Sequence, residues 1–142
     1  MDKSTLITTL KQHLPDDTEY NNRWRIDIPD GWVDIVANLH DKIMEICPNY
    51  PLKQVKEKFG GLRFYVGPMS AELLYQVDYL IDKAEKLSAC TCEYCGKEGH
   101  LSRINNWLHT MCQWCFDERA KDAEDFSFDC RSIIENRLNP TN

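Results

Sequence analysis

Apolar residues recur at helical spacing in three stretches of the first half of the chain. The stretches are residues 4–14, 31–47 and 70–87. Ser4, Asp30 and Ser70 stand at their amino ends, where a short polar side chain can cap the free backbone N–H groups. Each stretch carries its apolar side chains on one face, so we expect three amphipathic helices, of which the two long ones need a partner surface.

Two further segments alternate apolar and polar side chains, which is the period of a half-buried strand. They are residues 23–28, RWRIDI, and residues 55–66, VKEKFGGLRFYV. The second contains Gly60-Gly61, a pair suited to the two-residue turn of a β-hairpin. The sequence therefore predicts an antiparallel hairpin, which the first segment extends.

A turn at the two glycines predicts the register of this hairpin. Phe59 would lie opposite Leu62, and Glu57 would lie opposite Phe64. The apolar face would then carry Val55, Phe59, Leu62, Phe64 and Val66. Glu57 would point toward the core, where a lone carboxylate is costly, so its surroundings test the register.

These elements predict an α+β fold in which two long amphipathic helices pack on a small antiparallel sheet. We expect residues 1–88 to form this core domain. Residues 89–142 would form a zinc finger with a C-terminal helical segment, whose last helix is expected at RSIIENRL, residues 131–138.

The cysteines indicate a metal site. The chain has seven of them and no export signal, which favours thiols or metal ligands over disulfides. The segment CEYCGKEGHLSRINNWLHTMCQWC contains two CxxC pairs separated by 16 residues. Two such pairs supply four soft ligands for a tetrahedral ion, so we expect one structural Zn²⁺ per chain. The predicted ligands are Cys92, Cys95, Cys112 and Cys115.

The order of elements around the cysteines is similar to that of treble-clef zinc fingers. Gly96 suits a knuckle after the first pair, residues 101–108 could form a hairpin, and residues 113–126 follow as a helix. Cys90 is an alternative to Cys92 as a ligand. For His100 and His109, a surface or packing role is favoured over a ligand role. The alternative to a metal site is that the cysteines are buried free thiols.

Charge separates the middle of the chain from its ends. The net charge is -6, yet residues 51–91 carry 6 basic and 5 acidic side chains. On the predicted hairpin, the face away from the core carries Lys56, Lys58, Arg63 and Tyr65. This face suits an acidic patch on a protein or the phosphates and bases of a nucleic acid. The alternative is an ordinary solvated strand face.

No apolar run approaches the roughly 20 residues that span a bilayer. The amino-terminal residues are polar and amphipathic and lack the apolar core of a signal peptide. We therefore expect a cytoplasmic protein with no membrane partner.

Four stretches together resemble a family of small proteins that bacteria and their phages encode. They are DGW at residues 30–32, VKEKFGGLRFYVG at 55–67, CEYCG at 92–96 and MCQWC at 111–115. The resemblance implies an accessory role, such as modulation of host machinery from a phage genome. It brings no assigned reaction and no catalytic residues.

We therefore expect a noncatalytic, zinc-stabilised protein that binds and inhibits a host protein, such as a defence or nucleic-acid enzyme. A nucleic-acid-binding module that uses the basic hairpin and the finger is the first alternative. A metal-dependent, nuclease-like enzyme is the second. Asn105, Asn106 and His109 hint at the latter, but no second histidine follows Cys115 to complete a catalytic metal site.

Overall fold

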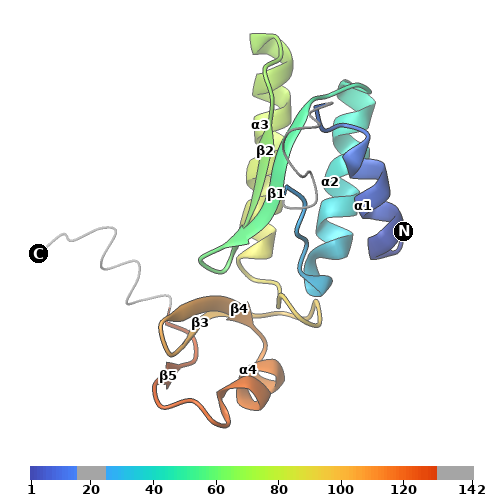
Figure 1. The fold of residues 1–142 in the computed structure, drawn as a ribbon. Helices are drawn as coiled ribbons and strands as arrows, with labels where there is room; N and C mark the ends of the chain where they lie inside the picture. The colour runs from blue at the N-terminus through green and yellow to red at the C-terminus, as the bar shows by residue number, and fades with distance from the viewer. Residues whose placement is uncertain (16–24, 131–142) are drawn as a thin grey trace, which may run out of the picture.

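The computed structural model describes residues 1–15 and 25–130 and has the expected α+β fold. Three helices and a two-stranded sheet form the larger part (Figure 1). A second, three-stranded sheet and a short helix form a smaller part beside the tip of the hairpin (Figure 1). The helix expected at residues 131–138 lies outside the described residues.

The three predicted helices form, with shifted starts. They are α1 (Lys3–Lys11), α2 (Val33–Ile46) and α3 (Ala71–Ser88). Ser70 caps α3 as predicted, but α1 is capped by Asp2, whose carboxylate accepts from the Thr5 N–H at 2.7 Å. Asp30 does not cap α2. It opens a 3₁₀ turn, η2 (Asp30–Trp32), and its carboxylate binds Lys3 Nζ at 2.8 Å.

The hairpin forms, but its register differs from the predicted one. Strands β1 (Leu52–Lys58) and β2 (Gly61–Val66) are antiparallel, with Val55 opposite Phe64 and Glu57 opposite Leu62. The turn residues are Phe59 and Gly60, with φ of 54° and 82°. A type I′ turn needs positive φ at both positions, so the turn lies one residue earlier than a Gly-Gly turn.

The shift moves Phe59 from the predicted core face into the turn and leaves the other predicted residues on their faces. Phe59, expected in the core, is 67% exposed. Leu52, Val55, Leu62 and Phe64 are the buried side chains of the hairpin. Of the expected strand 23–28, the structure describes only residues 25–28, where Ile26 makes a single parallel bridge to Val55.

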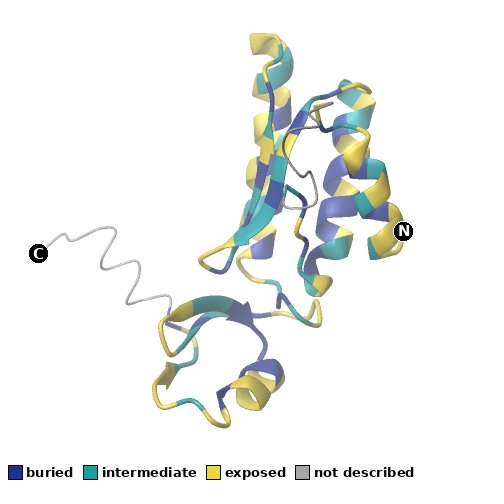
Figure 2. Ribbon diagram, viewed as in Figure 1, coloured by how far each residue is buried: buried dark blue, intermediate teal, exposed yellow. Residues whose placement is uncertain are grey.

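The buried residues form two hydrophobic clusters. Figure 2 marks the buried residues along the ribbon. The larger lies between the hairpin and the three helices, where α3 contacts α2 and β2, and α1 contacts α2. Trp32 and Tyr50 are its largest fully buried side chains. The smaller cluster surrounds the cysteines and includes Met111 and Phe116. Two clusters agree with two modules, and the domain boundary at residue 88 stays a prediction.

The smaller part contains the predicted knuckle, hairpin and helix. Its strands are β3 (His100–Ile104), β4 (Trp107–Met111) and β5 (Phe126–Ser127), in the order β4-β3-β5. The helix is α4 (Gln113–Ala120), which ends six residues before the predicted end at residue 126. We call residues 90–130 the finger.

Candidate metal centre and its junction with the hairpin

The four predicted cysteines come together in the finger. The sulfur atoms of Cys92, Cys95, Cys112 and Cys115 all lie within 4.8 Å of one another and could hold a metal ion. Cys95 Sγ and Cys112 Sγ are 3.6 Å apart. The set consists only of sulfur donors, which suits a closed tetrahedral site without an open coordination position. The site can therefore stabilise the finger, while its four-sulfur shell leaves no place for a substrate.

Two local structures orient these sulfurs. Gly96 has φ of 81° and donates its N–H to the Cys92 carbonyl at 3.0 Å, which closes the knuckle. Cys112 is the N-cap of α4, and its sulfur accepts from the Cys115 N–H at 3.4 Å. A helix amino end favours a thiolate because its free N–H groups carry partial positive charge.

The short distances between the sulfurs also shift the pKa values of three of these thiols in different directions. Burial alone would raise the pKa of Cys112, but hydrogen bonds from Cys115 and the other cysteines lower it to about 7. Burial, together with the neighbouring thiols, raises the pKa of Cys115 and of Cys95. The thiolate is therefore favoured at Cys112 and disfavoured at Cys115 and Cys95. A divalent cation among the four sulfurs would favour the thiolate form of all of them.

The structure places the alternative ligands outside this group. Cys90 is exposed at the end of α3, where its thiol contacts the Leu87 carbonyl at 3.4 Å. His100 packs its ring against Phe128. His109 belongs to a different cluster, described below. The other two cysteines, Cys47 and Cys130, also lie outside the four-sulfur group.

Glu57 lies at the junction between the hairpin and the finger. Its Oε1 accepts from the Gly60 N–H at 2.8 Å, across the hairpin turn. Its carboxylate also approaches Glu93 and His109 of the finger, so that ligand atoms of all three lie within 4.8 Å of one another. Glu57 therefore lies at the margin of the sheet, where its carboxylate avoids the cost of burial without a partner.

Glu93 is the most buried carboxylate of this junction, with only 4% of its surface exposed. Its Oε2 accepts from the Thr110 N–H at 2.6 Å, and its Oε1 lies 3.3 Å from His109 Nδ1. The hydrogen bond to Glu93 raises the pKa of His109 against the opposing effect of burial. Glu93 was not among the predicted site residues, although its place between two ligand cysteines was a signal.

Hydrogen bonds to backbone carbonyl groups hold the finger against the core. Gly31 donates its N–H to the Glu93 carbonyl at 2.7 Å, and Trp32 Nε1 donates to the Thr91 carbonyl at 2.8 Å. A Cβ on Gly31 would lie 2.0 Å from the Cys92 carbonyl oxygen. At the hairpin tip, Thr110 Oγ1 donates to the Gly60 carbonyl at 2.6 Å. The DGW and FGG stretches therefore have a structural role, because they form the core side of this junction.

The four predicted binding residues share the outer face of the hairpin. Lys56 lies directly opposite Arg63, and Tyr65 and Lys58 are exposed on neighbouring rows. Arg63 is half-buried and donates to the Leu62 carbonyl at 3.1 Å. Its charge also offsets part of the burial effect that raises the pKa of Glu85 on α3.

Other side chains extend this outer face. Tyr65 lines a shallow hollow together with Arg25 and Lys53. The Lys58 ammonium lies 5.5 Å from the centre of the exposed Phe59 ring. The face thus combines cations with two exposed aromatic rings.

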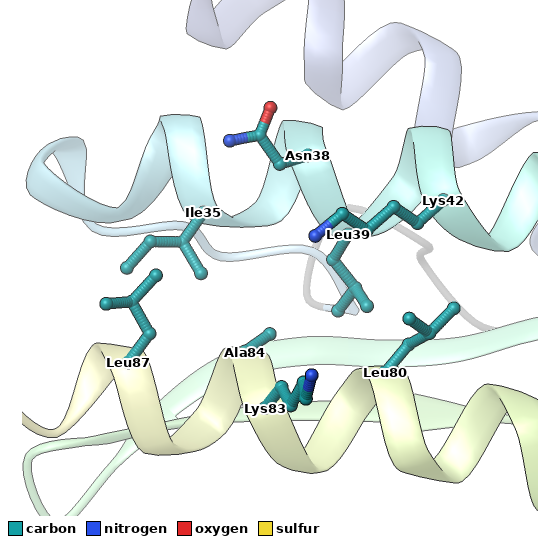
Figure 3. A pocket seen from close by; sticks show the side chains of 8 residues that line it. All are labelled: Ile35, Asn38, Leu39, Lys42, Leu80, Lys83, Ala84 and Leu87. Atoms are coloured by element: carbon teal, nitrogen blue, oxygen red, sulfur yellow. The ribbon is translucent and has the colours of Figure 1, made fainter.

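A separate groove lies between α2 and α3, with a volume of about 120 Å³ (Figure 3). It is lined by Ile35, Asn38, Leu39, Lys42, Leu80, Lys83, Ala84 and Leu87. Its side chains are mainly apolar, and Lys42 and Lys83 lie along it (Figure 3). It has no group of metal ligands and no pair of carboxylates for acid–base chemistry.

Comparisons with known proteins found no match among family models, curated proteins or solved structures. In the described part of the chain, no helix is both long and apolar enough to cross a membrane.

Proposed function

We propose that the protein is a noncatalytic, zinc-stabilised interaction protein whose hairpin binds an acidic surface on a partner protein. The finger contributes by holding the hairpin tip. Zinc is proposed for the four cysteines because a site with only thiolate donors at these spacings suits this ion. The phage origin and the inhibition of a host defence or nucleic-acid enzyme stay predictions from the family resemblance.

The observation that carries the proposal is the exposed Phe59 at the hairpin tip. It is 67% exposed and has φ of 54°, a backbone conformation that is unfavourable for a bulky side chain. Strained residues of this kind cluster at binding and active sites. Aromatic residues and arginine are also enriched among the residues that dominate binding energy in protein interfaces.

The charges of the outer hairpin face support an acidic partner. Like charges directly opposite each other destabilise a sheet, yet Lys56 lies opposite Arg63. Within residues 1–15 and 25–130, neither Lys56 nor Lys58 forms an ion pair. Acidic groups on a partner would relieve this repulsion and would also steer association.

A charge-reversal experiment tests the proposal. In an affinity capture, the double variant Lys56→Glu/Lys58→Glu should recover at least about tenfold less partner than the wild type. A tenfold loss corresponds to about 1.4 kcal/mol of binding free energy, and the variant removes two charged contacts. Captured proteins would be quantified by mass spectrometry. Lys42→Glu/Lys83→Glu is the matched control, since it changes net charge equally on exposed residues along the groove.

Equal recovery with the hairpin variant and the wild type would contradict the proposal. A nucleic-acid partner is the alternative that Phe59 and Tyr65 also suit, because bases stack on exposed aromatic rings. It would appear as binding that weakens steeply with salt concentration and that the same double variant reduces.

A further inference from the structure

A second group of metal-ligand side chains lies beside the four cysteines without sharing a residue with them. Glu57 is on β1, Glu93 is in the knuckle, and His109 is on β4. One ligand atom from each lies within 4.8 Å of the others. Glu93 and His109 pair within the finger, and Glu57 joins them because the finger docks on the hairpin.

The surroundings hold both carboxylates in place. The Gly60 N–H donates to the Glu57 carboxylate, and the Thr110 N–H donates to the Glu93 carboxylate. Such supporting hydrogen bonds are typical of metal-ligating carboxylates. Glu93 is almost fully buried and Glu57 and His109 are half-buried, so the repulsion between the two carboxylates is only partly screened by water.

We propose that Glu57, Glu93 and His109 form a second metal site, for a divalent first-row cation, at the junction of the hairpin and the finger. Two carboxylates and one imidazole suit Mn²⁺, Fe²⁺ or Zn²⁺ more than a soft thiophilic ion. Three protein ligands leave coordination positions for water, which distinguishes this site from the closed four-cysteine site. The site also ties the core to the finger through the ion.

Manganese tests this site because it prefers oxygen and nitrogen ligands to thiolates. Full-length protein with its cysteine-bound metal in place would be titrated with Mn²⁺, and free Mn²⁺ would be followed by electron paramagnetic resonance. The wild type should bind one Mn²⁺ per chain. Glu57→Gln should weaken binding at least about tenfold, since even the loss of an outer-shell partner costs that much.

Glu98→Gln is the matched control, because Glu98 is an exposed residue of the finger outside the cluster. It should bind Mn²⁺ as the wild type does. His109→Gln provides a second variant if Glu57→Gln does not fold, and it should weaken Mn²⁺ binding in the same way. Circular dichroism and the content of the cysteine-bound metal would establish that each variant is folded.

A second probe separates the two sites by their spectra. Co²⁺ added to the zinc-loaded protein should give the weak absorption of an oxygen and nitrogen site, without the strong thiolate-to-cobalt charge transfer of a cysteine site. Glu57→Gln should remove that weak absorption.

No Mn²⁺ binding by the wild type at millimolar concentration would overturn the proposal, as would equal affinities of the wild type and Glu57→Gln. A protonated His109 would then be the group that balances the two carboxylates. These outcomes are independent of the capture experiment, because that experiment changes Lys56 and Lys58 and none of the three residues of this site.

Discussion

Single residues at the junction decide how closely the finger can approach the core. Gly31 is the clearest case, because an added Cβ would lie 2.0 Å from the Cys92 carbonyl oxygen and 2.7 Å from the Gly96 nitrogen. Both are backbone atoms of the knuckle, which cannot move away without distorting the cysteine site. The glycine of DGW is therefore required by packing between the two modules.

Gly31→Ala should lower the free energy of unfolding by about 2 kcal/mol or more, because overpacking against backbone atoms costs about 1–3 kcal/mol. Urea unfolding and the metal content of purified protein would measure this. Gly61→Ala is the matched control, since its Cβ would lie 3.1 Å from the flexible end of Arg63 and no closer than 3.8 Å to a backbone atom, the Lys58 carbonyl oxygen. Equal stability of the two variants would contradict the close docking of the finger.

A buried histidine in the core predicts a pH dependence. His40 is 3% exposed, and its Nδ1 lies 2.7 Å from the Tyr50 hydroxyl. Burial, and then the nearby His13, lower the pKa of His40 from its ordinary value of 6.5. The folded state therefore resists protonation more than the unfolded state does. Stability from this group is complete above pH 6.5 and is lost as the pH falls from there through the lowered pKa.

The wild type should accordingly lose more stability than His40→Gln between pH 7.5 and pH 5.5. Urea unfolding at the two pH values would give the difference. Other groups that titrate in this range, such as the cysteines and His109, are present in both proteins, so their effects cancel. The same loss in both proteins would show that His40 takes up its proton equally in the folded state.

The hairpin turn shows how one element can store strain. Phe59 and Gly60 both have positive φ, and only the second is a glycine. The other tight turn, between β3 and β4, has Asn105 at φ of 54°. Asparagine tolerates this conformation far better than phenylalanine does.

Phe59→Asn should raise the free energy of unfolding by about 1 kcal/mol. This is the lower end of the roughly 1–2 kcal/mol that the left-handed backbone conformation costs most residues. The reciprocal variant Asn105→Phe should lower it by a similar amount, and thermal or urea unfolding would measure both. If the proposed function is right, Phe59→Asn should also capture less partner despite its greater stability. A destabilised Phe59→Asn would instead show that the ring supports the fold.

At the scale of the whole molecule, the two hydrophobic clusters should respond differently to loss of the metal. The smaller cluster includes three of the four cysteines, whereas the larger one has its own apolar core between helices and hairpin. Small metal-dependent modules are commonly unfolded without their ion. We therefore expect the finger to unfold first and the core to remain folded.

Cys112→Ser should lose the zinc, expected at one per chain, and the amide-exchange protection of β3, β4 and α4, while α2 keeps its protection. Metal analysis and hydrogen exchange would measure the two effects. Cys90→Ser is the matched control, because Cys90 is exposed and outside the four-sulfur group. Loss of zinc from Cys90→Ser, or a protected finger in metal-free Cys112→Ser protein, would contradict this assignment.

Local patterns in the sequence determined much of this molecule. Cysteine spacing identified the four clustered sulfurs, because two residues between cysteines suit a tight turn around one ion. Helical periodicity placed α1, α2 and α3, since an amphipathic face is a property of the segment itself. The alternation in the hairpin likewise indicated two strands.

Only the tertiary structure decided the register of that hairpin and the contents of the junction. Gly60-Gly61 and Phe59-Gly60 are both possible two-residue turns, so the local sequence does not distinguish them. In the structure the finger packs against Gly60 through Leu101 and Thr110. Glu57, Glu93 and His109 belong to separate elements, so no local pattern relates them. Glu57 approaches the Glu93–His109 pair of the finger because the two modules dock, and this docking depends on contacts between residues far apart in the chain.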